Sequence, residues 1–257
     1  MRFAFWNTNK KLINSYIVSL VRDFQIDTLI LAEYSDDISF LIDSLDFQIV
    51  SSTGCDRLKL LSNKSFFDIG PQASHYSFQI VNEDYLLCCL HLISKTYDQD
   101  GRRRAYDIEE IMINVEAIKE RNNINKVVFV GDFNENPYES NVLEARLFHA
   151  LPCYYELEND SRIVSGKTYT KYYNPMWNLF GDKDSPPGTF FHMSSSPVEP
   201  FWHMFDQVII SKEMFPRFLT DTLRIVTDTS NGPLFRDGFR PNNLISDHFP
   251  IVFEIGD

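Results

Sequence analysis

The chain has 257 residues, of which 44% are hydrophobic and 23% are charged. This composition supplies enough apolar residues for a substantial core and excludes a disordered or fibrous protein. The 36 acidic side chains outnumber the 24 basic ones and give a net charge of −12. Such a charge argues against non-specific binding to long nucleic acids through the field of the whole molecule, but it does not exclude a local basic groove.

The sequence shows no sign of export or of a membrane anchor. The first residues, MRFAFWN, lack an apolar run and a small-residue cleavage site, and no segment approaches the run of about 18 apolar residues that crosses a bilayer. The four cysteines lack C-x-x-C spacing, so neither zinc nor a disulfide framework is indicated. We therefore expect a cytoplasmic protein with no membrane segment and with reduced thiols.

Apolar runs predict a series of strands in the first half of the chain. We expect strands at 2–6, 28–32, 47–51, 58–62, 76–81 and 85–92. Between the first two strands, Leu12, Tyr16, Leu20 and Phe24 predict the apolar face of a helix. A short helix over about 36–44 follows the second strand. This half should therefore mix helices with meandering strands.

The second half begins with the clearest helical pattern in the chain. Ile108, Ile111, Met112, Val115 and Ile118 recur at intervals of three and four residues and predict a helix over 102–121. A strand at 127–130, a helix near 139–148 and final strands near 223–226 and 249–255 are also expected. Between about 152 and 205 the periodicity fails and aromatic residues are frequent, which predicts an irregular insertion. No linker or repeat divides the chain, so we expect a single domain over 1–257.

Polar side chains lie at or beside the ends of many of these strands. Because a strand that ends in a carboxylate, amide or imidazole delivers that group to the rim of a sheet, several such endings predict one site. The candidate catalytic residues are Asn7, Glu33, His91, Asp132, Asn134, Asp206, Asp247 and His248.

These residue types match the needs of phosphate ester hydrolysis, which are a cation, a group that activates water and donors to the phosphate oxygens. Hard oxygen ligands such as Glu33, Asp132 or Asp247, with an Asn carbonyl, suit magnesium or manganese better than zinc. His91 and His248 can donate to phosphate or move protons near neutral pH.

Each residue also has a simpler interpretation. Taken singly, Glu33 is a capping carboxylate, and Asn7, Asp132 and Asn134 are ordinary turn formers. Unrelated turns need not assemble the chemistry of a metal site, so the combination favours the functional interpretation. The run Arg102 to Arg104 can be solvated or can grip phosphate. The aromatic residues of the insertion can pack together or stack on bases.

Short motifs along essentially the whole chain resemble those of the endonuclease/exonuclease/phosphatase superfamily. They are WN at 6–7, LAE at 31–33, HL at 91–92, GDFNxxP at 131–137, FDQVI at 205–209 and SDHxPI at 246–251. That superfamily includes nucleases, abasic-site endonucleases, deadenylases, sphingomyelinases and inositol-phosphate phosphatases. The resemblance implies an α+β fold, a two-sheet αβ sandwich flanked by helices with the active site at one edge of the sheets.

The resemblance also implies a role for each candidate residue. Glu33 would be the principal ligand of Mg²⁺ or Mn²⁺, helped by Asn7 and Asp247. Asp132 would orient or deprotonate the attacking water, and Asn134 would stabilise the transition state. His248 would donate to the phosphate, held in its tautomer by Asp206, and His91 would hold a second oxygen or aid the leaving group. Either Asp132 or His248 can be the general base.

The expected activity is that of a metal-dependent phosphodiesterase or nuclease, acting as a monomer on nucleic acid or nucleotides. Arg102, Arg103 and Trp177 are candidate substrate contacts. Several branches of the superfamily have an Arg and a Gln at the start of the helix after the HL motif, whereas this chain has Arg but no Gln there. The alternatives are a phosphomonoesterase, a lipid phosphodiesterase and a non-catalytic binding module on the same fold.

Overall fold

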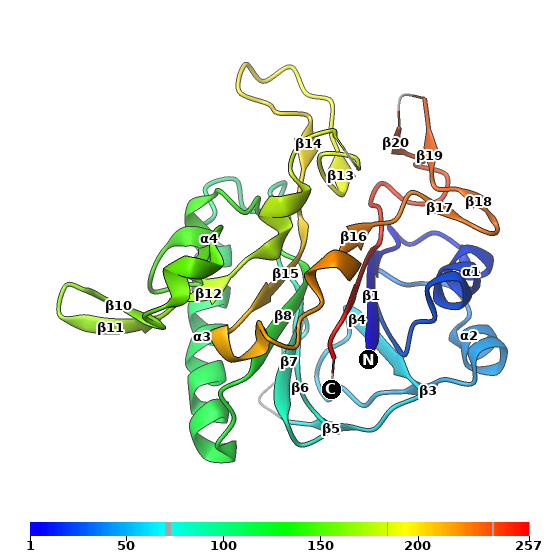
Figure 1. Ribbon diagram of the computed structural model, residues 1–257. Coiled ribbons are helices and arrows are strands. Elements are labelled where there is room, and N and C mark those ends of the chain that lie inside the picture. Colours follow the sequence, from blue (N-terminus) through cyan, green and yellow to red (C-terminus); the bar gives the residue numbers. More distant parts are fainter. Residues whose placement is uncertain (70–72, 184, 238, 257) are drawn as a thin grey trace.

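The computed structural model of the protein describes residues 1–69, 73–183, 185–237 and 239–256. Within these residues the chain forms two large mixed sheets with helices on the outside (Figure 1). The expected two-sheet αβ sandwich is therefore confirmed.

The first sheet has six strands in the order β16-β21-β1-β2-β4-β3. Strands β1 and β2 are parallel, so that Asn7 lies opposite Ala32 at the same edge and Glu33 comes next along the chain. The expected strands at 28–32 and 58–62 are confirmed. The strands are β1 (Arg2–Asn7), β2 (Thr28–Ala32), β3 (Gln48–Ile49), β4 (Leu58–Ser62), β16 (Arg224–Ile225) and β21 (Ile251–Glu254).

The second sheet has seven strands in the order β5-β6-β7-β8-β15-β12-β9. The register places His91 opposite Asp132 and Asp132 opposite Asp206, which makes one row across three neighbouring strands. The strands are β5 (Phe66–Asp68), β6 (Tyr76–Val81), β7 (Tyr85–His91), β8 (Val127–Asp132), β9 (Ala150–Leu151), β12 (Tyr172–Tyr173) and β15 (Asp206–Ile210).

Helices cover the outer faces of the sandwich (Figure 1). Helix α3 (Arg102–Asn122) connects the parallel strands β7 and β8, and its expected apolar stripe is buried at Ile108, Ile111, Val115 and Ile118. Helices α1 (Asn14–Phe24) and α2 (Ile38–Leu45) lie side by side on the first sheet. Among the described residues, no helix combines the length and the apolar character needed to span a membrane.

The two faces of β7 belong to different parts of the core. Cys88 packs in the layer that also contains Ile108 and Ile111 of α3. Cys89 packs in the main cluster, together with residues of both sheets. The adjacent cysteines therefore point to opposite faces, as expected of a strand, and both are buried free thiols.

Two helical expectations are corrected. Leu12 is 76% exposed because α1 begins only at Asn14, and the buried face of this helix is Ile17, Val18, Leu20 and Val21. The helix expected over 139–148 is reduced to α4 (Ser140–Leu143), because Glu144 adopts an extended conformation. Leu147 and Phe148 are nevertheless buried, so these residues reach the core from an irregular segment.

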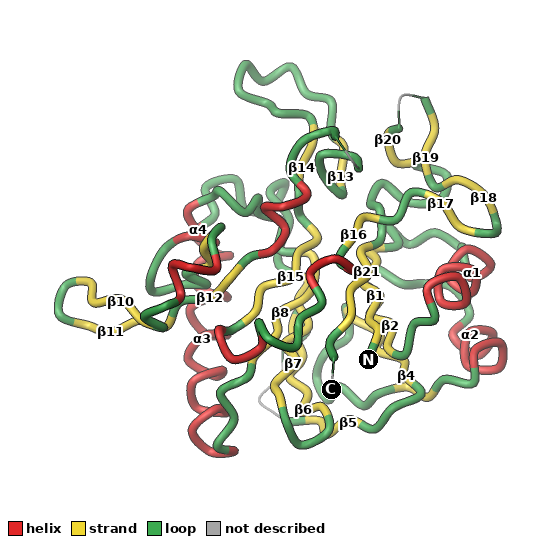
Figure 2. Tube along the Cα trace, in the orientation of Figure 1, coloured by secondary structure: helices red, strands yellow, loops and turns green. Residues whose placement is uncertain are grey.

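Short elements and long loops fill the rest of the chain (Figure 2). The segment expected to be irregular, 152–205, contains the hairpin β10–β11 and the pair β13–β14, besides β12 of the second sheet. The remaining elements are β10 (Ser161–Val164), β11 (Lys167–Thr170), β13 (Phe190–Phe191), β14 (Trp202–His203), β17 (Asp228–Thr229), β18 (Gly232–Pro233), β19 (Phe235–Arg236), β20 (Arg240–Pro241) and the 3-10 turns η1 (Tyr154–Leu157), η2 (Pro175–Leu179), η3 (Lys212–Met214) and η4 (Thr220–Thr222).

Candidate active site

The polar residues predicted from the strand ends gather at one edge of the two sheets. His91, Asp132 and Asp206 come from the row across the second sheet, and Asn7 ends β1 of the first sheet. The loop that carries Asp247 and His248 is tied to the same end of β1. Ser246 Oγ donates to the backbone carbonyl of Asn7 at 2.7 Å, and Trp6 Nε1 donates to that of His248 at 2.9 Å.

Asp132 is the hydrogen-bonded centre of this group and is almost completely buried. Its Oδ2 accepts from Asn7 Nδ2 at 3.0 Å, and its Oδ1 accepts from the backbone N–H of Asn134 at 2.9 Å. Asn134 has a positive φ of 49° and donates its side-chain amide to the carbonyl of Leu92 at 3.0 Å. One carboxylate thus joins the two sheets and fixes the loop that follows β8.

His248 and Asp206 form a buried dyad. The two side chains meet through His248 Nδ1 and Asp206 Oδ2 at 2.8 Å. Burial opposes a charge on the imidazole, but the carboxylates of Asp206, Asp132 and Asp247 outweigh it and raise the pKa of His248 to about 10. Burial also raises the pKa of Asp206, yet the imidazole is the more basic partner, so the pair holds its proton on the ring. His248 Nε2 remains for a substrate.

The dyad is also contacted by the insertion. Phe190 of β13 forms a backbone bridge with His248, and its ring lies 4.8 Å from the imidazole, centroid to centroid. Trp177, a predicted substrate contact from the same insertion, packs instead against Phe180 at 5.4 Å in η2. The aromatic residue of the insertion that contacts the dyad is therefore Phe190, which belongs to none of the motifs, and for Trp177 the observed aromatic contact is with Phe180.

Glu33 and His91 form the more open side of the site. Glu33 has a positive φ of 49° just after β2, and its Oε1 lies 3.5 Å from His91 Nε2. The imidazole of His91 lowers the pKa of Glu33, partial burial opposes this, and the charge of Lys10 adds to the lowering. His91 Nε2 also lies 4.0 Å from Asp132 Oδ2, so the imidazole bridges two carboxylates.

Two donor sets at this edge could hold a divalent metal. Asp132, Asp206 and His248 offer ligand atoms within 4.8 Å of one another; hydrogen bonds occupy the Asp132 carboxylate and one oxygen of Asp206, whereas Asp206 Oδ1 is buried without a hydrogen-bond partner among the described residues. The predicted set is Glu33, Asn7 and Asp247. Glu33 is a partly exposed carboxylate, and Asp247 Oδ1 is a buried oxygen without a hydrogen-bond partner among the described residues. Hard oxygens with free lone pairs fit Mg²⁺ or Mn²⁺, so each set offers one buried carboxylate oxygen that such an ion could take.

The three consecutive arginines at the start of α3 have different surroundings. Arg102 is exposed and lies 3.2 Å from Asp100. Arg103 is exposed and lines a cavity of about 700 Å³ that Glu33 and His91 also line. Arg104 is only 2% exposed. Successive helical residues are about 100° apart around the axis, so the three arginines face solvent, the cavity and the interior in turn.

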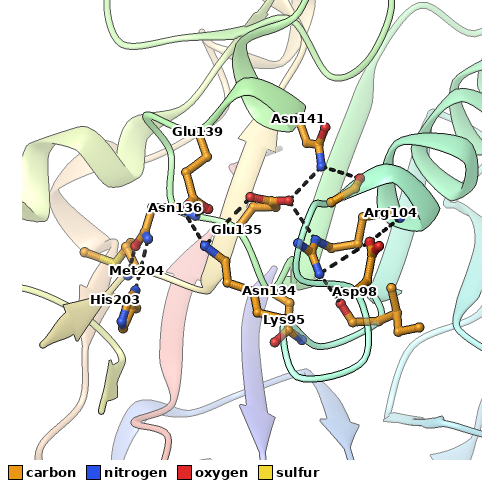
Figure 3. A network of polar contacts seen from close by, with 12 residues as sticks. Lys95, Asp98, Arg104, Asn134, Glu135, Asn136, Glu139, Asn141, His203 and Met204 are labelled. Atoms are coloured by element: carbon orange, nitrogen blue, oxygen red, sulfur yellow. Dashed lines mark hydrogen bonds and ion pairs between the residues drawn. The ribbon is translucent and has the colours of Figure 1, made fainter. Parts of the chain in front are cut away.

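Arg104 belongs to a buried polar network beneath the loop after Asp132 (Figure 3). Its Nε donates to Glu135 Oε1 at 2.7 Å, and its Nη1 donates to the carbonyl of Ile93 at 3.0 Å. Asn141 also donates to Glu135 Oε1 at 2.7 Å, and Lys95 pairs with Glu139. Burial and the adjacent Glu139 raise the pKa of Glu135 to about 7, although Arg104 opposes this.

Asn136 connects this network to the insertion (Figure 3). Its side chain accepts from the backbone N–H of Met204 at 2.9 Å and meets His203 Nδ1 at 3.0 Å. Gln207 donates to the carbonyl of Glu135 at 2.6 Å. The segment 135–141 is therefore held from three sides. None of these supporting residues was predicted, because their partners are distant in sequence and no local pattern marks them.

Comparisons with known proteins give the fold family. No protein-family model and no curated protein matches the sequence. Among solved structures, D. rerio TDP2 complexed with single strand DNA product is 13% identical with a TM-score of 0.61, over 100% of this chain and 99% of that one. The 3' phosphatase NExo from Neisseria, bound to product DNA hairpin, is 13% identical with a TM-score of 0.58 over 100% of both chains.

A third similar structure is an AP endonuclease from Archaeoglobus fulgidus, 10% identical with a TM-score of 0.58 over 99% of both chains. All three proteins are members of the endonuclease/exonuclease/phosphatase superfamily, and the chain has the fold of that superfamily over its whole length. The resemblance predicted from the motifs is confirmed at the level of the fold.

Proposed function

We propose that the protein is a divalent-metal-dependent phosphoesterase, and specifically a phosphodiesterase or nuclease acting on nucleic acid or nucleotides. One observation carries the proposal. The row His91, Asp132 and Asp206 meets Asn7, Glu33 and His248 at a single edge, where their side chains contact one another. Structural turns have no reason to bring these groups together. The similar folds that hold DNA products support a nucleic acid substrate.

The hydrogen bonds support a division of roles. His248 Nδ1 is committed to Asp206, so its Nε2 donates to a non-bridging phosphate oxygen. Because the surrounding carboxylates keep a proton on His248, Asp132 is the group that orients water and takes its proton. His91, close to both Glu33 and Asp132, donates to a second phosphate oxygen or to the leaving group. Asn134 stabilises the charge that develops in the transition state.

Glu33, Asn7 and Asp247 would hold Mg²⁺ or Mn²⁺, and the bound ion would neutralise charge on the phosphate. The test is turnover of wild-type and Glu33→Ala protein with each metal, against single-stranded DNA, duplex DNA, RNA and a small phosphodiester. We expect cleavage by the wild type only, and only with metal, and we expect a chelator to abolish it. Full activity of Glu33→Ala would overturn the site.

The same assay separates the alternatives. Release of inorganic phosphate from a 3'-phosphorylated oligonucleotide, with no cleavage of internal bonds, would identify a phosphomonoesterase; the similar fold of a 3' phosphatase makes this the second candidate. Silence with every substrate, combined with weak metal binding in calorimetry, would identify a non-catalytic module on this fold.

A further inference from the structure

Beside Glu33 and His91 lies a cavity of about 700 Å³ whose other walls carry four basic side chains. They come from three parts of the chain: Lys10 follows β1, Arg57 and Lys59 lie at the start of β4, and Arg103 lies in the first turn of α3. We call Lys10, Arg57, Lys59 and Arg103 the basic wall. Glu33 and Asp56 are the acidic residues that also line the cavity.

The basic wall has no counter-charges in contact with it. None of its four side chains forms an ion pair with any residue that the structure describes; Lys10, Arg57 and Arg103 are exposed and Lys59 is half-buried. The chain carries 12 more acidic than basic residues, so four cations gathered around one hollow, with two acidic residues, are not an average property of its surface. Such a local cluster favours an anionic ligand.

The position of the wall indicates which anion. The scissile phosphate of the proposed reaction lies at Glu33, His91 and Asp132, and the basic wall continues from this point into the cavity. Arg57, Lys59 and Arg103 are not among the residues that contact the catalytic row, so they are available to a second phosphate. A lipid or sugar with a single phosphate offers no second phosphate to these side chains, whereas a polynucleotide offers one at every nucleotide.

An aromatic side chain completes the cavity. Tyr97, in the loop between β7 and α3, lines the cavity and is 76% exposed. Exposed tyrosines beside basic grooves are platforms on which unpaired bases stack. The volume is that of a small-molecule pocket, which suits a short stretch of single strand better than a duplex.

We propose that this cavity is the binding subsite for a single-stranded polynucleotide, with Arg57, Lys59 and Arg103 on the phosphate next to the scissile one and Tyr97 under its base. This inference rests on the proposed phosphoesterase function and narrows its substrate class to single strands longer than one nucleotide.

The test compares a single-stranded DNA 10-mer with a small diester that has only one phosphate. In Arg57→Ala/Lys59→Ala, the ratio of kcat/KM for the 10-mer to that for the diester should fall about 10- to 100-fold, because two charge-assisted phosphate contacts are lost. The salt dependence of 10-mer binding, log Kd against log salt, should flatten by roughly 0.7 for each lost contact. Thermal unfolding checks that the variant folds.

A matched control is Arg162→Ala/Lys167→Ala, which removes the same charge from the distant hairpin β10–β11 (Figure 1) and should leave the ratio unchanged. For Tyr97, the Ala variant should bind the 10-mer about tenfold more weakly, and the Phe variant should retain the ring and the affinity. An unchanged ratio in Arg57→Ala/Lys59→Ala, or duplex bound as tightly as single strand, would overturn the inference.

Failure of the two proposals can be told apart. Fluorescence anisotropy of a labelled 10-mer, measured without metal, reports the subsite independently of turnover. Loss of this binding in Arg57→Ala/Lys59→Ala, with no hydrolysis of any substrate by the wild type, would support the subsite and overturn the phosphoesterase. If the wild type hydrolyses its substrates but Arg57→Ala/Lys59→Ala binds the 10-mer as tightly as the wild type does, the subsite alone would be overturned.

Discussion

Arg104 and Glu135 meet at 2.7 Å directly beneath the loop that carries Asn134, and their side chains are only 2% and 6% exposed. The pair joins the start of α3 to the segment after β8. Asp98, which is also buried, lies 3.6 Å from the same guanidinium. Removing the cation would leave two buried carboxylates without the guanidinium, with only Asn141 and Lys95 beside Glu135 and only backbone N–H groups on Asp98.

Arg104→Met should therefore destabilise the protein by about 3–5 kcal/mol, the cost typical of breaking a buried ion pair from one side. Urea unfolding measures the change. Arg102→Met is the matched control, because Arg102 is exposed and pairs only with the exposed Asp100; its effect should stay within about 0.5 kcal/mol. Equal effects of the two substitutions would show that the buried pair contributes little.

Glu135→Gln should alter the pH dependence of stability. The pKa of Glu135 is raised to about 7, so between about pH 4.5 and 7 the folded state holds a proton that the unfolded state has released. Wild-type stability then falls as pH rises through this window. Glutamine does not titrate. The unfolding free energy of the variant, relative to that of the wild type, should therefore rise by about 1–3 kcal/mol between pH 5 and pH 8.

The unfolding free energies of both proteins at pH 5 and pH 8 test this prediction. Glu139, whose pKa is lowered to about 2 by Glu135 and Lys95 against the effect of burial, titrates below this window in the wild type. A difference between variant and wild type that is the same at both pH values would show that Glu135 is not protonated in the folded state.

Asp206→Asn should reduce kcat by about 10²- to 10⁴-fold while the protein remains folded. The amide cannot supply the charge that holds a proton on His248, although it can keep the 2.8 Å contact with Nδ1. The assay is hydrolysis of the small diester, with circular dichroism for the fold. Asp228→Asn, at an exposed strand residue, is the control, and comparable rates for the two variants would contradict the role of the dyad.

Gly131→Ala should abolish the native fold or destabilise it by more than about 4 kcal/mol. A Cβ at this position would lie 1.9 Å from the carbonyl oxygen of Leu90 on the neighbouring strand, and no side chain can move to relieve a backbone clash. Gly256→Ala, where the nearest atom would be 3.5 Å away, should fold normally. Soluble yield and the melting temperature compare the two.

The sequence predicted the regular part of the fold because local patterns and tertiary packing agree there. The strands at 28–32, 58–62 and 76–81 were predicted to the residue, and the helix expected over 102–121 ends one residue later, at Asn122. The helix expected over 139–148 was wrong beyond Leu143, because Glu144 is extended and the buried Leu147 and Phe148 reach the core without helical structure.

The residues of the site could be named because most of them end a strand, begin one or lie within a few residues of one, and strand ends can be read from the sequence. Their supports could not be named. Glu135 lies 31 residues from Arg104, and the run of three arginines looks like a solvated helix start. Only the register of α3 against the loop after β8 shows that the third arginine points inward.

The row His91, Asp132 and Asp206 has a consequence for how the protein loses activity. These three residues face one another across β7, β8 and β15, three neighbouring strands in the middle of the larger sheet. Separating these three side chains therefore requires the central strands of the sheet to part, which belongs to the largest opening events of the molecule. Local fraying would leave the catalytic geometry intact, so inactivation by heat or urea should coincide with the cooperative melting of the sheet.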